Sequence, residues 1–427
     1  MRRRRLLALL CVSASLLSGC GLLPGGSERH TVTVWLMKDS ASQEFLERFT
    51  KDFEHEHPDL RLDIRIQEWT GIGDKVQKVL AGGRPGDEEG NHPDAPDVIE
   101  VGNTQVPQYV EGGRLLDLTL ESARDWGGKD WLPGLAEPGQ LRYHQYGIPW
   151  YAANRVVIYR KDLFARAGVT APPRTRAQWL DVTERLDGDG TQGIYLAGQD
   201  WYTLAGFIWD EGGELATEEG GRWSGALDSP AALRGMDFYR RLHALGEGPA
   251  DADEEHPPQA GVFASGKAAQ IVAVPGLARA ILDSNPELKG KLGFFPVPGH
   301  AAGKPGAVFT GGSDLVVPRS TDRREDAIAV VAALTGARWD TDLARTMNYV
   351  PNKAKLASAV AGEEGVAAMA AGAAQGRATP STPEWAAVEA DNPIKAYMTK
   401  VLTGSDPATE ARRASERITE ALTVDAG

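Results

Sequence analysis

The chain has 427 residues, a formal net charge of −13 and two cysteines. Because one hydrophobic core usually divides beyond roughly 250–300 residues, this length predicts two lobes. The acidic balance argues against nucleic acid or an anionic lipid surface as a partner, and it permits neutral or cationic ligands.

The first element in chain order is an export signal. Four arginines at residues 2–5 precede an apolar run that ends at Leu17, which is too short to span a bilayer and has the length of a signal-peptide core. The run LSGC, which ends at Cys20, resembles the lipobox of bacterial lipoproteins. That resemblance implies a signal peptide over residues 1–19, a lipid on Cys20 and a tether over residues 20–29 that holds the body at the extracellular face of the cell membrane. An ordinary signal peptide with an incidental cysteine is the alternative, and the arginines leave the export route open.

A strand and a helix open the folded body. The β-rich run TVTVWLM (31–37) predicts a buried strand. Ser40 and Gln43 fit a capping box at the start of the following helix. Phenylalanines recur at every fourth position of that helix (Phe45, Phe49 and Phe53), so they predict one apolar helical face.

Two further strands and a helix continue this lobe. The run LRLDIRIQ (60–67) alternates strictly between apolar and polar residues, which predicts a strand covered on one face. A helical pattern over residues 72–80 and the run DVIEVG (97–102) complete a β-α-β-α-β order. This order predicts a mostly parallel sheet flanked by helices, in which a ligand lies at the carboxyl ends of the strands.

The remaining chain has fewer distinct patterns. Gly82–Asp97 is dense in glycine, proline and acid, which is typical of a surface insertion. The β-rich run Tyr146–Arg160 is expected to cross to a second lobe that is largely helical. A return strand is predicted in FTGGSDLVVP (309–318), and the last third of the chain is predicted to be helical and rich in alanine.

Two motifs suggest a cofactor, and both are weak. Gly261–Ala268 has the spacing of a phosphate-binding loop, but alanine stands where Mg²⁺ binding needs Ser or Thr. His55 and His57 are two residues apart on a helix, so they point in different directions and have no third ligand nearby. We therefore expect no cofactor, no metal and no catalytic residues, although acidic residues are too numerous to exclude a glycosidase pair by counting.

Four stretches, in order and at plausible spacing, resemble the extracellular solute-binding proteins of carbohydrate ABC transporters, of the maltodextrin-binding type. They are TVTVWLM with its helix, Pro96–Thr119, Tyr146–Val169, and the run from FASGKAAQIVAVPG through FPVPG to GGSDLVVP. VWLM, VIEVGNT and GIPWYAANRVVIYR look most similar to the actinobacterial lipoproteins that bind chitobiose and N-acetylglucosamine. The insertion at Gly82–Asp97 departs from the family pattern and is expected to remodel one rim of the cleft.

The resemblance implies an α/β fold of two lobes, the type II periplasmic-binding-protein fold, with each lobe a sheet flanked by helices. Lobe 1 is expected to hold residues 30–147 and 308–355, and lobe 2 residues 148–307 and 356–427, joined by crossover strands. The resemblance also implies a monomer without enzymatic activity that captures a neutral oligosaccharide by hinge closure and delivers it to the permease of an importer. A receptor for a non-sugar solute and an exported glycosidase are the alternatives.

The candidate ligand contacts are aromatic rings and polar groups near strand ends and crossings. They are Trp35, Lys38 and Asp39 after the first strand, Asn103 after the third, Trp150 and Tyr151 in the crossover, Trp69, Trp201 and Trp209 elsewhere, and Gly276 and Gly312 as points of close backbone approach. Core packing is the alternative for each tryptophan. Trp179, Trp339 and Trp385 lie in amphipathic helical patterns and are expected to be structural.

Overall fold

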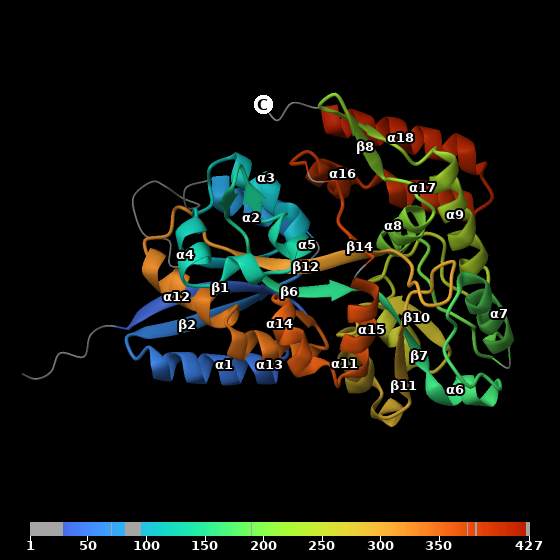
Figure 1. Cartoon of the computed structure of the whole chain (residues 1–427), viewed down its shortest axis with the longest axis horizontal. Coiled ribbons are helices and arrows are strands. Elements are labelled where there is room, and N and C mark those ends of the chain that lie inside the picture. Colours follow the sequence, from blue (N-terminus) through green and yellow to red (C-terminus); the bar gives the residue numbers. More distant parts are fainter. Residues whose placement is uncertain are drawn as a thin grey trace, which may run out of the picture.

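The computed structural model describes residues 29–69, 71–81, 95–188, 190–373, 375–380 and 382–423. Within them the chain forms two lobes, which lie left and right in Figure 1. The predicted signal peptide, Cys20, the tether up to residue 28 and the insertion from residue 82 to 94 lie outside the described residues. Of the helices in the described part, none is both long and apolar enough to cross a bilayer.

Lobe 1 is built on a seven-stranded sheet. Its strands are β1 (His30–Met37), β2 (Leu60–Gln67), β3 (Val98–Gly102), β6 (Ile148–Asn154), β12 (Val308–Val316), β13 (Val350–Pro351) and β14 (Gly376–Arg377). Their order is β13-β6-β12-β3-β1-β2, with β14 paired to the start of β12. β1 pairs in parallel with β2 and β3, as predicted, whereas β12 runs antiparallel to β3 and β6.

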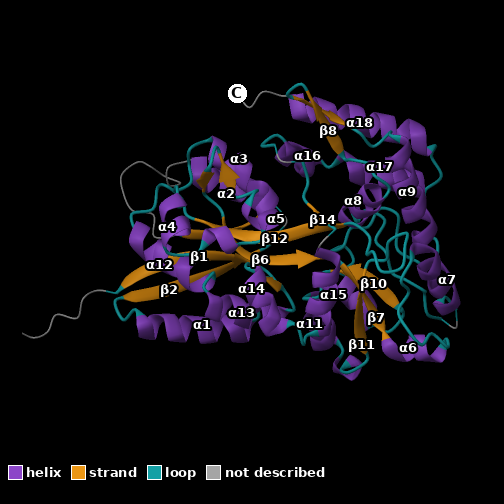
Figure 2. Ribbon diagram, viewed as in Figure 1, coloured by secondary structure: helices purple, strands orange, loops and turns teal. Residues whose placement is uncertain are grey.

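Helices cover both faces of this sheet (Figure 2). They are α1 (Gln43–Glu56), α2 (Ile72–Ala81), α3 (Val106–Glu111), α4 (Thr119–Arg124), α5 (Pro133–Ala136), α12 (Arg324–Leu334) and α13 (Ala337–Met347). The predicted phenylalanine face of α1 is confirmed, because Phe45, Phe49 and Phe53 are buried. The rings of Phe45 and Phe49 meet the ring of Trp339 edge-on, with centroids 5.7 and 5.2 Å apart.

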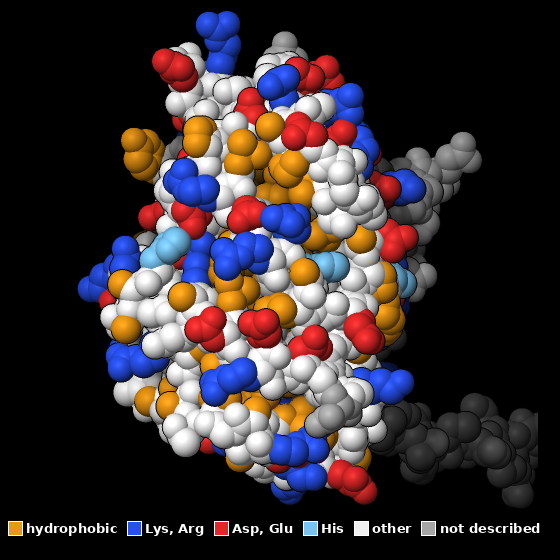
Figure 3. All heavy atoms as spheres, turned by 90° about the vertical axis from the view of Figure 1, so that its right-hand side faces the viewer, with side chains coloured by type: hydrophobic (Ala, Val, Ile, Leu, Met, Phe, Trp, Pro, Cys, Tyr) orange, Lys and Arg blue, Asp and Glu red, His pale blue; other side chains and the backbone are white. Residues whose placement is uncertain are grey.

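Lobe 2 has a smaller antiparallel sheet of β7 (Val156–Arg160), β10 (Gln270–Ala273) and β11 (Leu292–Pro296), in the order β10-β7-β11. Its helices are α6 (Lys161–Arg166), α7 (Arg176–Leu186), α8 (Trp201–Asp210), α9 (Pro230–His243), α10 (Gln259–Ala264), α11 (Leu277–Ser284), α16 (Trp385–Asp391), α17 (Pro393–Leu402) and α18 (Pro407–Thr423). The run that resembles a phosphate loop forms most of α10 and the turn into β10. On the face seen in Figure 3, basic and acidic side chains are interspersed.

The chain passes between the lobes in the described part by way of β6, β12 and the segment that contains α14 (Ala354–Ala357) and α15 (Glu364–Ala373). Lobe 2 was expected to begin at residue 148. Because β6 pairs with β12 and β13, residues 148–154 belong to the large sheet, and the first crossing lies at Arg155. Apolar side chains from both lobes share a small core beside these crossings, which includes Ala152, Ile158 and Val366.

Two local predictions need correction. The helix α1 is capped by Ser42, whose Oγ accepts from the Phe45 N–H at 3.2 Å, and not by Ser40. Ser40 instead donates to the Glu100 carboxylate at 2.7 Å, since a buried carboxylate requires donors. The alternation of β2 also breaks near its end: Ile66 is 50% exposed, whereas Gln67 is buried.

Two short hairpins lie on the lobes. β4 (Gln140–Leu141) pairs with β5 (His144–Gln145) on lobe 1, and β8 (Ala216–Glu219) pairs with β9 (Arg222–Gly225) on lobe 2. Each is closed by a loop of two residues, because Leu141 is opposite His144 and Glu219 is opposite Arg222.

Candidate functional site

The parallel strands β1 and β3 end at the same edge of the large sheet, and the residues that follow them face lobe 2. Lys38 and Asp39 follow β1 and are exposed. Lys38 Nζ lies 3.0 Å from Glu68 Oε1, and this hydrogen bond raises the pKa of Lys38. Asp39 has a left-handed φ of 65°, a conformation that costs free energy for a residue with a Cβ.

Asn103 follows β3 at the same edge. Its side chain is 1% exposed, and its Nδ2 donates to none of the described residues. An unpaired buried amide costs about 1–3 kcal/mol, so this group is available to a ligand acceptor that enters the junction.

A buried hydrogen-bond network holds this edge in place. The Glu100 carboxylate on β3 accepts from the Met37 N–H at 2.7 Å and lies 2.7 Å from Ser40 Oγ and 3.1 Å from the Tyr151 hydroxyl. Ser313 on β12 donates to the same hydroxyl at 3.1 Å. Burial raises the pKa of Glu100, while these donors act in the opposite direction. The network links β1, β3, β6 and β12, so Tyr151 positions the edge.

Tyr349 connects the network to lobe 2. Its ring stacks on the ring of Tyr151 with centroids 4.1 Å apart, and its hydroxyl donates to the Asp39 backbone oxygen at 3.1 Å. Gly276 of lobe 2 lies against it: a Cβ there would fall 2.9 Å from the Met347 backbone oxygen and 3.1 Å from Tyr349 Cε1. Gly276 therefore permits the close approach of one lobe to the other.

A carboxylate from lobe 2 reaches lobe 1 at this junction. Glu389 lies on α16, and α16 is on the side of lobe 2 that faces α3 of lobe 1 in Figure 1. Its Oε1 accepts from Trp385 Nε1 at 3.0 Å, and its carboxylate is also hydrogen-bonded to the Thr104 side chain of lobe 1. Burial raises the pKa of Glu389 to about 7, against the effect of these two hydrogen bonds. Burial also raises the pKa of Tyr109 on α3, and the nearby charge of Glu389 raises it further, so the two side chains are neighbours.

Aromatic rings adjoin this carboxylate. The rings of Trp201 and Tyr202 on α8 have centroids 4.0 Å apart, and the Trp385 ring lies 6.5 Å from Trp201. Burial raises the pKa of Tyr202, with Glu389 the next contributor. The junction therefore combines a carboxylate and an unpaired amide with the partly buried ring of Tyr202, and such groups bind the polar rim and apolar faces of a small ligand.

Arg155 stands at the crossing itself. Its guanidinium lies 4.6 Å from the Tyr202 ring centroid and pairs with Glu254 and, at 3.5 Å, with Asp200. The cavity beside Arg155 and Tyr202 measures about 10 Å³, roughly the space of one water. Ligand pockets usually measure several hundred Å³, so a solute at this junction requires the lobes to separate.

A family model for the bacterial extracellular solute-binding proteins matches residues 38–341. The chain belongs to this family. It is 34% identical over 393 residues to the diacetylchitobiose binding protein DasA of Streptomyces coelicolor, across 91% of this chain and 89% of that protein. The family acts outside the cytoplasm, in agreement with the predicted export.

Two solved structures of solute-binding proteins have a similar fold. One is an ABC transporter solute-binding protein of Thermotoga lettingae, with a TM-score of 0.80, 22% identity, and coverage of 92% of this chain and 100% of that one. The other is the GacH receptor of Streptomyces glaucescens, with a TM-score of 0.80, 23% identity, and coverage of 93% and 99%. These likenesses confirm the predicted two-lobe fold.

Four of the predicted contacts lie in packed cores of this solute-binding protein. Trp150 is 0% exposed in the core of lobe 1, and Trp35 is buried toward α2, with Lys75 Nζ 4.6 Å from its ring centroid. Trp209 lies two helical turns beyond Trp201, buried in the core of lobe 2. A Cβ at Gly312 would fall 2.4 Å from the Tyr151 backbone oxygen, so strand packing requires this glycine. Trp69 is partly buried beside the cluster of Trp35.

The structure thus brings Lys38, Asp39, Asn103, Tyr151, Trp201 and Gly276 to the lobe junction and adds groups that the sequence reasoning missed. The missed groups are Thr104, Tyr109, Tyr202, Tyr349 and Glu389. Trp385, which was expected to be structural, is indeed buried in the core of lobe 2, at 1% exposed. For Glu389 a signal existed: it follows Trp385 by four residues, so it lies on the same helical face as this buried indole, where a carboxylate is unusual.

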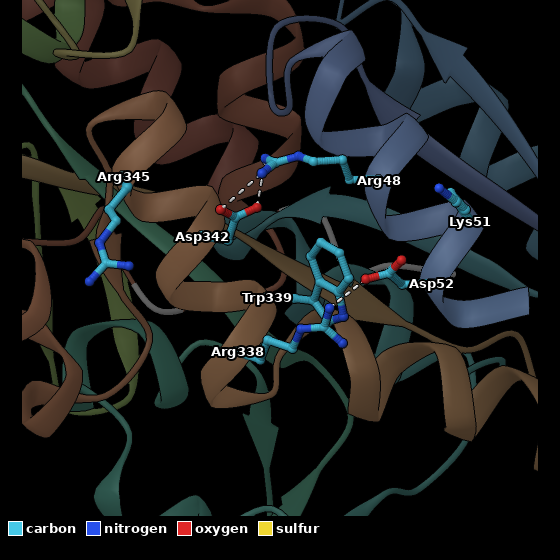
Figure 4. Close-up of a pocket in the computed structure, with 7 residues that line it drawn as sticks. All are labelled: Arg48, Lys51, Asp52, Arg338, Trp339, Asp342 and Arg345. Carbon is cyan, nitrogen blue, oxygen red and sulfur yellow. Dashed lines mark hydrogen bonds and ion pairs between the residues drawn. The ribbon is translucent and has the colours of Figure 1, made fainter. Parts of the chain in front are cut away.

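A groove on the outer side of lobe 1 is a different feature. It has a volume of about 370 Å³ and is lined by Arg48, Lys51, Asp52, Arg338, Trp339, Asp342 and Arg345 from α1 and α13 (Figure 4). Arg48 pairs with Asp342 and Arg338 with Asp52 across it. Lys51 and Arg345 leave the lining with a net positive charge, and no residue of the junction lines the groove, so it is not the candidate site for a neutral solute.

Proposed function

We propose that this protein is the solute receptor of an ABC importer and that it binds a neutral oligosaccharide between its lobes, with N,N′-diacetylchitobiose the first candidate. The observation that carries the proposal is the identity of 34% to a diacetylchitobiose binding protein over 91% of this chain. The solute-binding proteins described above are receptors, which favours binding without chemical turnover.

The chemistry of the lobe junction supports this ligand class. Trp201 and Trp385 are buried in the core of lobe 2, and the partly buried Tyr202 packs on Trp201, so Tyr202 is the aromatic ring of this group that a sugar ring would reach when the lobes separate. Asn103 Nδ2 would donate to a carbonyl or hydroxyl oxygen, and Glu389, in the protonated form that burial favours, would donate to a hydroxyl or acetamide carbonyl oxygen. An N-acetylated disaccharide carries all of these partners.

Transport requires capture and release. The ligand stabilises the closed arrangement only if it binds that state better than the open one, and the crossings near Arg155 would act as the hinge. Both lobes belong to one chain, so a monomer forms a complete site. The lipobox-like run at Cys20 supports a lipid anchor that keeps the receptor beside its transmembrane subunits.

A thermal-shift screen of the lipid-free body tests the proposal, with N,N′-diacetylchitobiose, N-acetylglucosamine, and xylo-, cello- and malto-oligosaccharides as probes. Binding to the folded state alone adds about 4 kcal/mol at a thousandfold excess over Kd, which raises Tm by several degrees. The Asn103→Ala variant should bind at least about tenfold more weakly without a lower unliganded Tm, since removal of the unpaired buried amide offsets the small cavity that the variant leaves.

Two results would contradict the proposal. A peptide or metal complex that raises Tm when no sugar does would overturn the carbohydrate assignment. Release of shortened sugars from a polymer would instead indicate a glycosidase.

A further inference from the structure

The two short hairpins make the same kind of turn with different residues. The loop of β8–β9 is Gly220–Gly221, with φ of 59° and 78°. The loop of β4–β5 is Arg142–Tyr143, with φ of 51° and 69°. A two-residue turn with positive φ at both positions favours Asn-Gly or Gly-Gly, because a Cβ is strained in the left-handed region. The hairpin of lobe 2 has the favoured residues at this turn, and the hairpin of lobe 1 does not.

The strained turn displays its side chains to solvent. Tyr143 is 99% exposed, the highest value among the exposed large apolar residues of the described chain, and it makes no hydrogen bond there. Leu120, on the adjoining helix α4, is 74% exposed. Arg142 is exposed beside Tyr143 and pairs with no described carboxylate. Because Arg142 and Tyr143 make no described hydrogen bond or ion pair that offsets the strain, their exposure at this turn favours a role outside the fold.

The turn Arg142–Tyr143, the tip of the β4–β5 hairpin, is held in place on lobe 1. His144 Nδ1 lies 2.7 Å from an Asp117 carboxylate oxygen, and the Gln145 N–H donates to Thr119 Oγ1 at 2.9 Å. β5 therefore fixes the hairpin to the start of α4, next to Leu120. β4 packs against α3, the helix that carries Tyr109 of the lobe junction. The hairpin is thus connected to the lobe junction through α3, whereas α4 lies on the side of lobe 1 away from lobe 2 in Figure 1.

We propose that Arg142, Tyr143 and Leu120 form a docking surface for the extracellular part of the importer's transmembrane subunits. This inference rests on the proposed function. Tyrosine and arginine are the residues most enriched at binding hot spots, and here they stand together on a rigid support. The complementary surface is an apolar socket for Tyr143 beside a carboxylate for Arg142. A lipid surface fits less well, since the chain is acidic overall and Asp117 and Asp125 flank α4.

The test uses Arg142→Asn/Tyr143→Gly, which installs the favoured turn and removes both side chains. Because strain is relieved, Tm should stay equal or rise by about a degree or two. The Kd for N,N′-diacetylchitobiose should stay within about twofold of the wild-type value, whereas uptake of the labelled sugar by cells should fall at least about tenfold. Leu120→Ser should act in the same direction. Gly220→Asn, in the unstrained hairpin of lobe 2, is the matched control and should leave uptake unchanged.

The outcomes distinguish a docking role of the hairpin tip from a structural role and from a loss of solute binding. Normal uptake by the double variant would overturn the docking role, and so would a Tm that falls by several degrees, which would make the tip structural. Partition of the lipid-free body into vesicles that depends on Tyr143 would assign the tip to lipid instead. If the wild type binds no sugar, the proposed function fails. Docking is then decided by a photo-crosslinker at position 143, which must capture an importer transmembrane subunit where one at position 220 does not.

Discussion

Glu389 predicts that the receptor binds its solute more tightly as the pH falls. In the closed arrangement this carboxylate lies between Trp385 and Thr104, and burial raises its pKa from 4.5 to about 7. When the lobes separate, Thr104 moves away and water reaches the carboxylate, so its pKa returns toward the ordinary value. Between these two values the closed state binds more protons than the open state. Closure is therefore least favourable above pH 7 and gains free energy as the pH falls toward 4.5.

The size of the effect follows from the two pKa values. Their difference corresponds to about 3 kcal/mol over the whole range. Between pH 8 and pH 6 the closed state gains about tenfold over the open one, so a ligand that binds only the closed state should bind about tenfold more tightly at pH 6.

Calorimetric titration with N,N′-diacetylchitobiose at pH 6, 7 and 8 measures this dependence. Glu389→Gln keeps an oxygen for the Trp385 N–H and removes the titration, so its affinity should change little with pH. Glu384→Gln, just before the same helix, is the matched control and should retain the wild-type slope. Asp200 also has a raised pKa from burial, but it pairs with Arg155 and caps α8 within lobe 2, so closure should leave its partners unchanged and it should add little to the pH dependence of binding. An unchanged slope in Glu389→Gln would refute the assignment.

Three further outcomes are expected. Trp150→Ala should lower the free energy of unfolding by about 3–5 kcal/mol in a urea titration, because the indole is 0% exposed in the core of lobe 1. A change near zero would contradict this core position and favour Trp150 as a ligand contact. Cys20→Ala should move the protein from the membrane fraction to the medium, and continued membrane attachment would contradict the lipid anchor. Small-angle scattering should give a smaller radius of gyration with bound sugar than without, and an unchanged radius at saturation would contradict hinge closure.

The first part of lobe 1 could be predicted because its elements are consecutive and their patterns are local. β1, α1, β2, α2 and β3 follow one another, and a spacing of four residues identifies the buried face of α1 without knowledge of any partner. The crossing was harder to place. β6 lies between β12 and β13, and all seven of its residues are buried, so the sequence has no alternation to distinguish a strand of the large sheet from a connector.

The same burial explains why Trp150 and Tyr151 could not be assigned from sequence. On an interior strand both faces are covered, so an aromatic residue is buried in either direction, and only the partners distinguish packing from binding. The hydroxyl of Tyr151 is occupied by Glu100 and Ser313, which lie 51 and 162 residues away in sequence. A contact over such a separation leaves no local pattern.

Glu389 shows where the limit of sequence reasoning lies. Its position on an apolar helical face is a local signal, and burial of a carboxylate without a cation is costly enough to suggest a function. Glu389 is hydrogen-bonded to Thr104 on the other lobe, which lies 285 residues earlier in the chain. No sequence spacing connects these two residues. A site formed by two lobes is made of such long-range pairs, because each lobe contributes polar groups whose hydrogen-bond partners lie on the other lobe. The sequence can therefore identify a polar side chain that has no partner within its own helix or strand. Its partner is found only when the two lobes come into contact.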